Sequence, residues 1–205
     1  MSAAPRGGRG WLGWLLDLLR RRSTRYSVAA IVVVGFVGGI AFWGAFNTAL
    51  EYTNRLDFCI SCHEMRDNVY QEYVQTIHYK NPVGVRAICS DCHVPHDWTH
   101  KMLRKMKASF EVWGHLTGAI DTKEKFEAMR PTLAAHEWER MKASDSRECR
   151  NCHSFEAMNA DKQDARARTM HANAQKAGDT CIDCHKGIAH HMPKSAEKDE
   201  NFDVQ

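Results

Sequence analysis

All eight cysteines of this chain fall in four copies of one pattern, Cys-x-x-Cys-His. The copies are Cys59-Ile-Ser-Cys62-His63, Cys89-Ser-Asp-Cys92-His93, Cys149-Arg-Asn-Cys152-His153 and Cys181-Ile-Asp-Cys184-His185. Two thiols at this spacing can bond to the two vinyl groups of one porphyrin, and the adjacent His can then reach the iron. The pattern therefore predicts four covalently bound c-type haems.

Two other uses of cysteine are weaker interpretations. Zinc sites built from Cys-x-x-Cys pairs do not need a His directly after the second Cys, and all four pairs here have one. Disulfides occur in exported proteins, but they give no reason to repeat one pentapeptide four times.

Four irons have eight axial positions, and His63, His93, His153 and His185 of the motifs supply up to four. Among the remaining histidines, His78 and His171 are favoured as iron ligands because each precedes a motif at a matched place. His190 is next, since it follows the last motif by a short loop. For His96, ligation of an iron and contact with a haem propionate or with solvent are equally good interpretations. We expect the others, His100, His115, His136 and His191, to be structural or exposed.

The first motif continues as Glu64-Met65. The Met65 thioether could replace His63 on the iron, which would raise the haem potential. Residue chemistry alone favours the simpler interpretation, in which Met65 packs on the porphyrin.

The elements that position these residues begin with a membrane span. Residues 27–50 carry no charge, and as a helix they measure about 36 Å, enough to cross a hydrocarbon core of about 30 Å. A cleaved signal peptide is less consistent with so long an apolar stretch. Arginines at 6, 9, 20, 21, 22 and 25 precede the span, so the positive-inside rule predicts that residues 1–26 are cytoplasmic.

The segment before the span contains Trp11, Trp14 and several leucines. It is expected to form either an interfacial amphipathic helix or a frayed tail adsorbed to the membrane. The glycines of the span follow no clean GxxxG pair, so a homodimer through the anchor is only weakly signalled. The net charge of +3 is too small to indicate a nucleic-acid partner.

Residues 51–194 are expected to form a mainly α, haem-packed domain with little β structure, because about 150 residues must enclose four macrocycles. The order haem motif, lone His, haem motif occurs twice, which suggests two related dihaem halves. We predict helices over 98–118, over 122–141 with an interruption near Pro131, and over 161–177 with a stop at Gly178. The polar tail, residues 195–205, is expected to be disordered.

These features, with the segments CISCHEM, CSDCHVPH, EVWGHLTGAIDT, SDSRECRNCH and CIDCHKGIAHHMP, resemble the NapC/NirT family of membrane-anchored tetrahaem cytochromes c. The resemblance covers nearly the whole chain and is strongest to the NapC type of periplasmic nitrate respiration. It implies a single-pass protein of the bacterial inner membrane with a periplasmic haem domain. Such a protein oxidises quinol and passes electrons to a soluble periplasmic reductase, here most simply nitrate reductase.

The resemblance also implies roles for individual residues. It favours Met65 over His63 as a ligand of the first haem. By position after the second motif, Lys105 would hydrogen-bond the quinol and Glu111 would accept its proton.

Two other function classes are a small-molecule reductase with an open haem and a passive haem wire without a quinol site. The terminal acceptor also stays open between nitrate reductase and a reductase of nitrite or of another N- or S-oxide.

Overall fold

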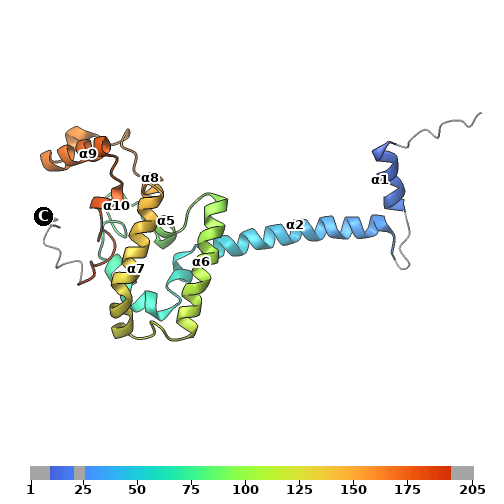
Figure 1. Cartoon of the computed structure of the whole chain (residues 1–205), viewed down its shortest axis with the longest axis horizontal. Helices are drawn as coiled ribbons and strands as arrows, with labels where there is room; N and C mark the ends of the chain where they lie inside the picture. The colour runs from blue at the N-terminus through green and yellow to red at the C-terminus, as the bar shows by residue number, and fades with distance from the viewer. Residues whose placement is uncertain (1–9, 21–25, 195–205) are drawn as a thin grey trace, which may run out of the picture. The chain divides into compact units, whose positions relative to one another are not determined.

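The computed structural model describes residues 10–20 and 26–194 and divides the chain into two units, Met1–Tyr52 and Thr53–Gln205. Within the described ranges the secondary structure is helical and includes no strand, in agreement with the expected mainly α class (Figure 1). The predictions for the arginines at 6, 9, 21, 22 and 25 and for the tail from Ser195 lie outside the described residues.

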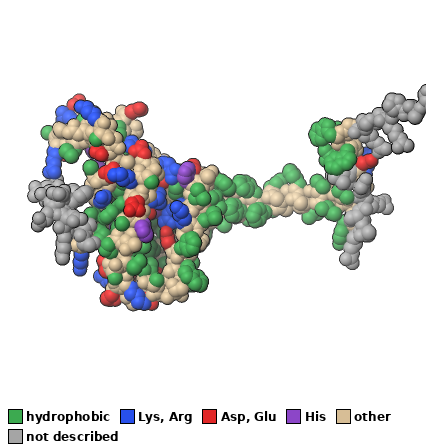
Figure 2. All heavy atoms as spheres, viewed as in Figure 1, with side chains coloured by type: hydrophobic (Ala, Val, Ile, Leu, Met, Phe, Trp, Pro, Cys, Tyr) green, Lys and Arg blue, Asp and Glu red, His purple; other side chains and the backbone are tan. Residues whose placement is uncertain are grey.

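The first unit contains α1, Trp11–Arg20, and α2, Val28–Tyr52. No residue of α2 is buried, and its length and hydropathy suffice to cross a membrane. On the face drawn in Figure 2, its surface is hydrophobic or uncharged. Near its end, the side chains of Asn47 and Thr48 donate hydrogen bonds to the carbonyls of Trp43 and Gly44, so these polar groups are satisfied within the helix.

α1 is a regular helix, and Trp11, Leu12, Trp14 and Leu16 are exposed on it. The helical alternative for this segment is thus observed. Its position in the membrane interface stays a prediction.

The second unit is a series of short and long helices (Figure 1). In chain order they are α3 Leu56–Cys59, a π-helical turn Met65–Val69, α4 Tyr70–Tyr73, α5 Cys89–His93, α6 Trp98–Leu116, α7 Lys123–Ala143, α8 Arg147–Arg150, a 3₁₀ turn Ala160–Lys162, α9 Ala165–Ala177 and α10 Cys181–Cys184. Each motif therefore lies at or inside a helix of only four or five residues.

Each of the three long helices of this unit begins at a side-chain N-cap. The side chains of Asp97, Thr122 and Asp164 accept hydrogen bonds from backbone N–H groups in the first turns of α6, α7 and α9. α9 ends at Gly178, which has a φ of 77° as a glycine C-cap requires.

Two helix predictions were wrong in detail. α7 continues through Pro131 instead of breaking there. The proline removes one backbone donor, and the buried side chains of Phe126, Arg130 and Met141 on either side hold the helix in place. The third helix begins at Ala165, later than expected, because the Asp164 cap follows a separate 3₁₀ turn.

The apolar core formed by the polypeptide is small. Among the described residues, the buried hydrophobic side chains are Tyr73, Phe126, Met141 and Ile182. A folded domain of this size normally buries many more. The shortage agrees with a fold in which large apolar prosthetic groups take the place of core side chains.

Candidate functional site

The eight cysteines are free thiols on or directly after the short motif helices, and none of them is fully buried. Their neighbours follow the order of the chain. A hydrogen bond with Cys89 and the charge of Lys105 lower the pKa of Cys59 to about 7, against the opposing effect of burial. Burial, then the neighbouring Cys149, raises the pKa of Cys92 to about 11, and Cys149 in turn interacts with Cys181. The four pairs of thiols thus form a series from the first motif to the last.

The motif histidines each face one further imidazole. The ring centres are 6.1 Å apart for His63 and His115, 6.3 Å for His78 and His153, 6.2 Å for His93 and His190, and 5.9 Å for His171 and His185. Two imidazoles bonded to opposite sides of one metal through nitrogen at about 2 Å have ring centres roughly 6 Å apart. All four spacings fit one iron between each pair, so the residues present suit haem.

The pairing joins segments that are distant in the sequence. His78 lies before the second motif but faces His153 of the third, and His190 lies after the fourth motif but faces His93 of the second. His171 faces His185 within the last part of the chain. The two sequence halves therefore exchange imidazoles.

Three of the paired imidazoles are oriented by a side-chain acceptor at Nδ1. His93 Nδ1 is 2.7 Å from Glu137 Oε1, His115 Nδ1 is 2.6 Å from Glu64 Oε1, and His171 Nδ1 is 2.9 Å from Gln163 Oε1. An imidazole that donates from Nδ1 presents Nε2 as the metal-binding atom. These acceptors therefore fix the tautomer that a haem iron needs.

Burial keeps other imidazoles neutral. It lowers the pKa of His190 to about 4 and lowers the pKa values of His78 and His185. Neutral imidazole is the form that binds iron. The Nδ1 atom of His78 is buried without a hydrogen-bond partner in the described part of the chain, as expected where a bound group would complete the surroundings.

An ion pair holds the loop that carries His190. The Arg130 guanidinium on α7 donates to both carboxylate oxygens of Glu72, at 2.7 and 3.0 Å. The same Glu72 accepts from the backbone N–H of His191 at 2.9 Å. Burial opposes ionisation of Glu72, but these bonds lower its pKa. The pair thus connects α4, α7 and the loop after the last motif.

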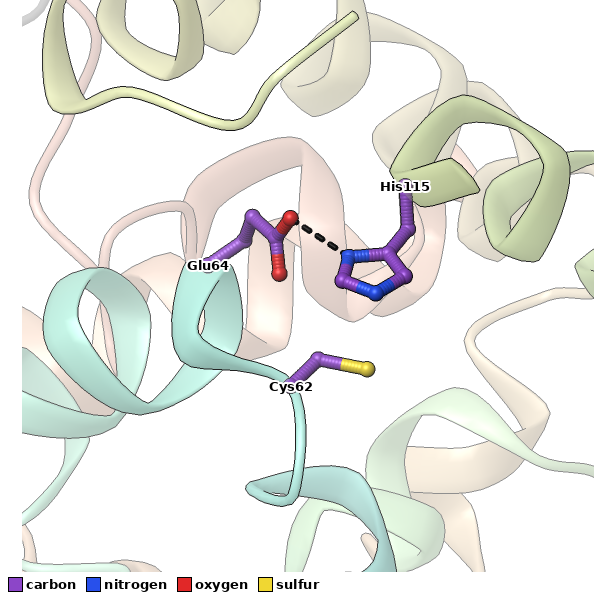
Figure 3. Close-up of side chains that lie close together, drawn as sticks. All are labelled: Cys62, Glu64 and His115. Atoms are coloured by element: carbon purple, nitrogen blue, oxygen red, sulfur yellow. Dashed lines mark hydrogen bonds and ion pairs between the residues drawn. The ribbon is translucent and has the colours of Figure 1, made fainter. Parts of the chain in front are cut away.

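The first motif has the most unusual surroundings (Figure 3). Glu64 is only 2% exposed, and its carboxylate points toward His115 while the Cys62 thiol lies close by. Cys62, Glu64 and His115 bring ligand atoms within 4.8 Å of one another. Because Cys62 belongs to a haem attachment motif, we assign this cluster to the first haem site and not to a separate metal ion.

The two candidate ligands of the first motif differ in what surrounds them. His63 Nε2 lies 3.3 Å from Glu64 Oε1, in addition to its ring contact with His115. Met65 begins the π-helical turn and is half-buried. Of the two, His63 is thus the side chain with a partner imidazole across the site.

The two predicted quinol residues lie on α6, and each has a polar partner of its own. Lys105 Nζ donates to Thr53 Oγ1 at 2.7 Å, and its charge acts on the Cys59 thiol. Glu111 is exposed and forms a 2.8 Å ion pair with Arg104. Of the two residues, Lys105 is thus the one that interacts with the first attachment site.

His96 is 59% exposed, and no imidazole pair of the described residues includes it. Its closest carboxylate is that of Asp91, at 4.0 Å.

Several residues of the site were not predicted from the sequence. His115 was expected to be structural or exposed, yet its ring faces His63. The sequence contains one indication for His115, which lies in the family-like segment EVWGHLTGAIDT. Its position far from every haem motif, however, does not indicate which haem it would ligate. The supporting charged residues have no local signal at all, because each meets its partner across the fold: Glu64, Glu72, Arg130 and Glu137.

The helical fold, the apolar helix α2, the motif thiols and the paired imidazoles define a membrane-anchored c-type cytochrome that transfers electrons. Comparison with known proteins is specific. The NapC/NirT cytochrome c family, N-terminal region, matches residues 21–195, and the chain belongs to this family.

Curated relatives match over most of the chain. The denitrification system component NirT of Stutzerimonas stutzeri is 63% identical over 95% of this chain and 98% of its own length. The cytochrome c-type protein NapC of Escherichia coli K12 is 53% identical over 94% and 93%. The cytochrome c-type protein TorC of the same strain is 46% identical over 87% of this chain and 46% of its own length. No solved structure gives a significant match.

Proposed function

We propose that each motif holds one haem c, giving four haems with the imidazole pairs described above as axial ligands. The second, third and fourth haems are then ligated by His93 and His190, His153 and His78, and His185 and His171. The uniform ring spacings support this assignment. Haem supplies the one-electron redox chemistry, and the protein sets the ligands and their hydrogen bonds.

For the first haem we propose His63 and His115, because their ring spacing matches the other three pairs. Met65 is the alternative ligand that the family resemblance favours. Near-infrared magnetic circular dichroism separates the two, since thioether and imidazole ligation give different charge-transfer bands. A thioether band that disappears in Met65→Leu would assign Met65.

The function that these observations support best is oxidation of membrane quinol and delivery of the electrons to a soluble periplasmic reductase. In this arrangement residues 1–26 are cytoplasmic, residues 27–50 cross the inner membrane, and residues 51–194 form the periplasmic haem domain. The observation that carries the proposal is Lys105, a cation that acts on Cys59 and bonds Thr53, the residue directly after α2.

The residues have distinct roles in this reaction. Lys105 donates a hydrogen bond to the quinol oxygen and stabilises the negative charge that develops there. Glu111, held by Arg104, accepts one of the two protons that quinol loses with its two electrons, and the other proton leaves to solvent. The series of neighbouring thiols supports an electron path from the first motif to the last.

Two electron acceptors are proposed on specific grounds. Periplasmic nitrate reductase is proposed as acceptor because the relative named NapC matches nearly the whole chain. A reductase of denitrification follows from the higher identity to the relative named NirT. Mixing the reduced protein with each purified reductase and its substrate, and timing haem reoxidation, identifies the acceptor.

The quinol reaction is tested anaerobically with the full-length haem-loaded protein in detergent. A reduced quinol analogue is added, and the haem absorption bands are followed by stopped flow. We expect reduction within seconds to minutes. Lys105→Ala should slow it about 10- to 100-fold, because a charge-assisted hydrogen bond contributes about 1.5–3 kcal/mol. Glu111→Gln should slow it as well.

Lys107→Ala is the matched control, since it removes an exposed cation two residues away on the same helix. It should leave the rate unchanged. If quinol reduces no haem, the protein is a passive haem wire or a reductase in its own right. If Lys105→Ala and Glu111→Gln both react at the wild-type rate, the site assignment is wrong.

A further inference from the structure

The turn that joins α7 to α8 has an unusual backbone. In the described part of the chain, Asp145 and Ser146 are the two residues other than glycine with a positive φ, 53° and 49°. This left-handed conformation is unfavourable for residues with a Cβ and is usual for glycine. Asp145 N–H donates to the Lys142 carbonyl at 3.0 Å and Ser146 N–H to the Met141 carbonyl at 2.7 Å, the bonds that normally end a helix at a glycine. Two such residues in succession persist only where their surroundings hold them.

Ser146 connects this turn to the fourth haem motif. The residue is completely buried, with 0% of its surface exposed. Its hydroxyl accepts a hydrogen bond from the backbone N–H of Ile182 at 3.1 Å, and Ile182 lies between the two cysteines of that motif. Without the hydroxyl, this buried N–H would lose its acceptor, which is unfavourable because the group is shielded from water. The contact joins residues 36 positions apart in the sequence.

Asp145 connects the same turn to the third haem motif. Arg150, which lies between the two cysteines of that motif, donates from Nε to the Asp145 carbonyl and from Nη2 to the Asp145 carboxylate, both at 2.8 Å. Each of the two left-handed residues therefore bonds a different motif. Glycine would fit this backbone without strain, but it could supply neither the Ser146 hydroxyl nor the Asp145 carboxylate.

The third and fourth motifs are also neighbours at their haem-binding atoms. Burial, then Cys181, raises the pKa of Cys149. Burial lowers the pKa of His185, and the imidazoles of His171 and then His153 lower it further. A haem c is attached by thioether bonds of fixed length. The separation of the two motifs therefore constrains the separation of the porphyrins attached to them.

We infer that Ser146 is a positioning residue, which fixes the spacing of the third and fourth motifs and thereby the rate of electron transfer between their haems. This role rests on the proposed function, in which each motif holds one haem c. Electron transfer slows exponentially as the gap between two haem edges widens, so a displacement too small to detach a haem still changes the rate.

A second bond crosses between the same segments, from Lys142 on α7 to Asp183 in the fourth motif, at 2.6 Å. Its Lys142 side chain is 65% exposed, so water and salt weaken this pair. The Ser146 bond is buried and has no such competition. Ser146 is therefore the residue to substitute in a test of the spacing.

The experiment uses the full-length haem-loaded protein, partly reduced with dithionite and without quinol. Electron exchange between haems is measured from the NMR signals of the haem methyl groups. Ser146→Ala should slow exchange between the third and fourth haems several-fold and leave exchange between the first and second unchanged. It should also accelerate amide hydrogen exchange at Ile182 several-fold, because this N–H loses its acceptor.

Ser144→Ala is the matched control, because it removes a hydroxyl from the same turn. The Ser144 hydroxyl donates to the Met141 carbonyl at 3.1 Å, which lies within α7 and not in the fourth motif. This substitution should change neither the electron exchange rates nor the amide exchange at Ile182.

Ser146→Gly keeps the test decisive if Ser146→Ala does not fold. Glycine suits the left-handed backbone but lacks the hydroxyl, so exchange between the third and fourth haems should again be several-fold slower. A wild-type exchange rate in Ser146→Gly overturns the inference. Equal slowing of both haem pairs also overturns it, since that would be general loosening. Fewer than four haems in the wild-type protein would instead contradict the proposed function.

Discussion

The hydrogen-bond acceptors behind the imidazoles differ from one proposed haem to the next. His93 and His115 face carboxylates, Glu137 and Glu64, whereas His171 faces the neutral amide of Gln163. A carboxylate makes the imidazole a stronger electron donor and stabilises ferric over ferrous iron. The residues therefore provide a means of setting different potentials on chemically identical ligand pairs.

The substitution Glu137→Gln should raise the reduction potential of the haem bound at Cys89 and Cys92. Burial would raise the pKa of Glu137, but the bonds from His93 and Arg140 hold it far below its usual range, so the wild-type group is a carboxylate. The amide introduced by the substitution would keep a hydrogen bond without the charge. Spectropotentiometric titration of the four haems measures the shift.

Glu139→Gln is the control for this change, because Glu139 is exposed on the same helix. It should leave the potentials nearly unchanged. Equal titration curves for Glu137→Gln and the wild type would contradict a role for Glu137 in tuning the haem.

At the scale of elements, α7 connects the haem motifs. Arg140 on this helix donates to the Cys92 carbonyl at 3.2 Å and lies 3.5 Å from Glu148 of α8. Lys142 pairs with Asp183 of α10 at 2.6 Å. Together with Glu137 at the second motif, these contacts link α7 to three of the four attachment sites. Through these polar contacts, α7 holds the motif segments together, which a larger apolar core would otherwise do.

The ion pair at the other end of α7 makes a prediction about stability and ligation. Arg130→Ala should lower stability by about 1–3 kcal/mol, because it leaves the partly buried Glu72 carboxylate without its guanidinium partner. It should also loosen the loop that carries His190. A lower thermal midpoint together with a high-spin signal from one haem, seen by electron paramagnetic resonance, would show both effects.

Lys125→Ala tests whether these effects are specific. Its ion pair with Asp121 is exposed, and such pairs contribute about 0–1 kcal/mol. It should change neither the midpoint nor the spin state appreciably. A fully low-spin Arg130→Ala protein would mean that the ion pair does not position His190.

At the scale of the whole haem domain, the exchange of imidazoles between the sequence halves makes the domain one cooperative structure. His78 is proposed to ligate the third haem and His190 the second. Neither half could then complete its haem ligation alone. The order of motifs and lone histidines repeats along the sequence, but the ligand pairs cross between the repeats.

Removing His78 tests this exchange directly. His78→Ala should make one haem high-spin, and His78→Ala with His190→Ala should make two high-spin. Adding Cys149→Ala and Cys152→Ala to His78→Ala should abolish the high-spin signal, because the affected haem is no longer attached. Persistence of the signal in that variant would show that His78 ligates a different haem.

The sequence alone determined the chemistry that depends on short-range spacing. The motifs, the apolar span, the start of α6 at Trp98 and the end of α9 before Gly178 follow from residues within a few positions of one another. Capping residues and attachment sites act over a few positions, so local rules suffice for these features. The family resemblance from linking segments was confirmed on the same basis.

Only the tertiary structure decided which groups meet. His78 and His153 are 75 residues apart in the sequence, and Glu64 and His115 are 51 apart, so no spacing rule joins them. The continuity of α7 through Pro131 likewise depends on contacts made by Arg130 with a distant carboxylate. The sequence identified the residues that attach haem. Long-range packing determined which residues lie opposite them, because ligation, burial and ion pairing all act through space.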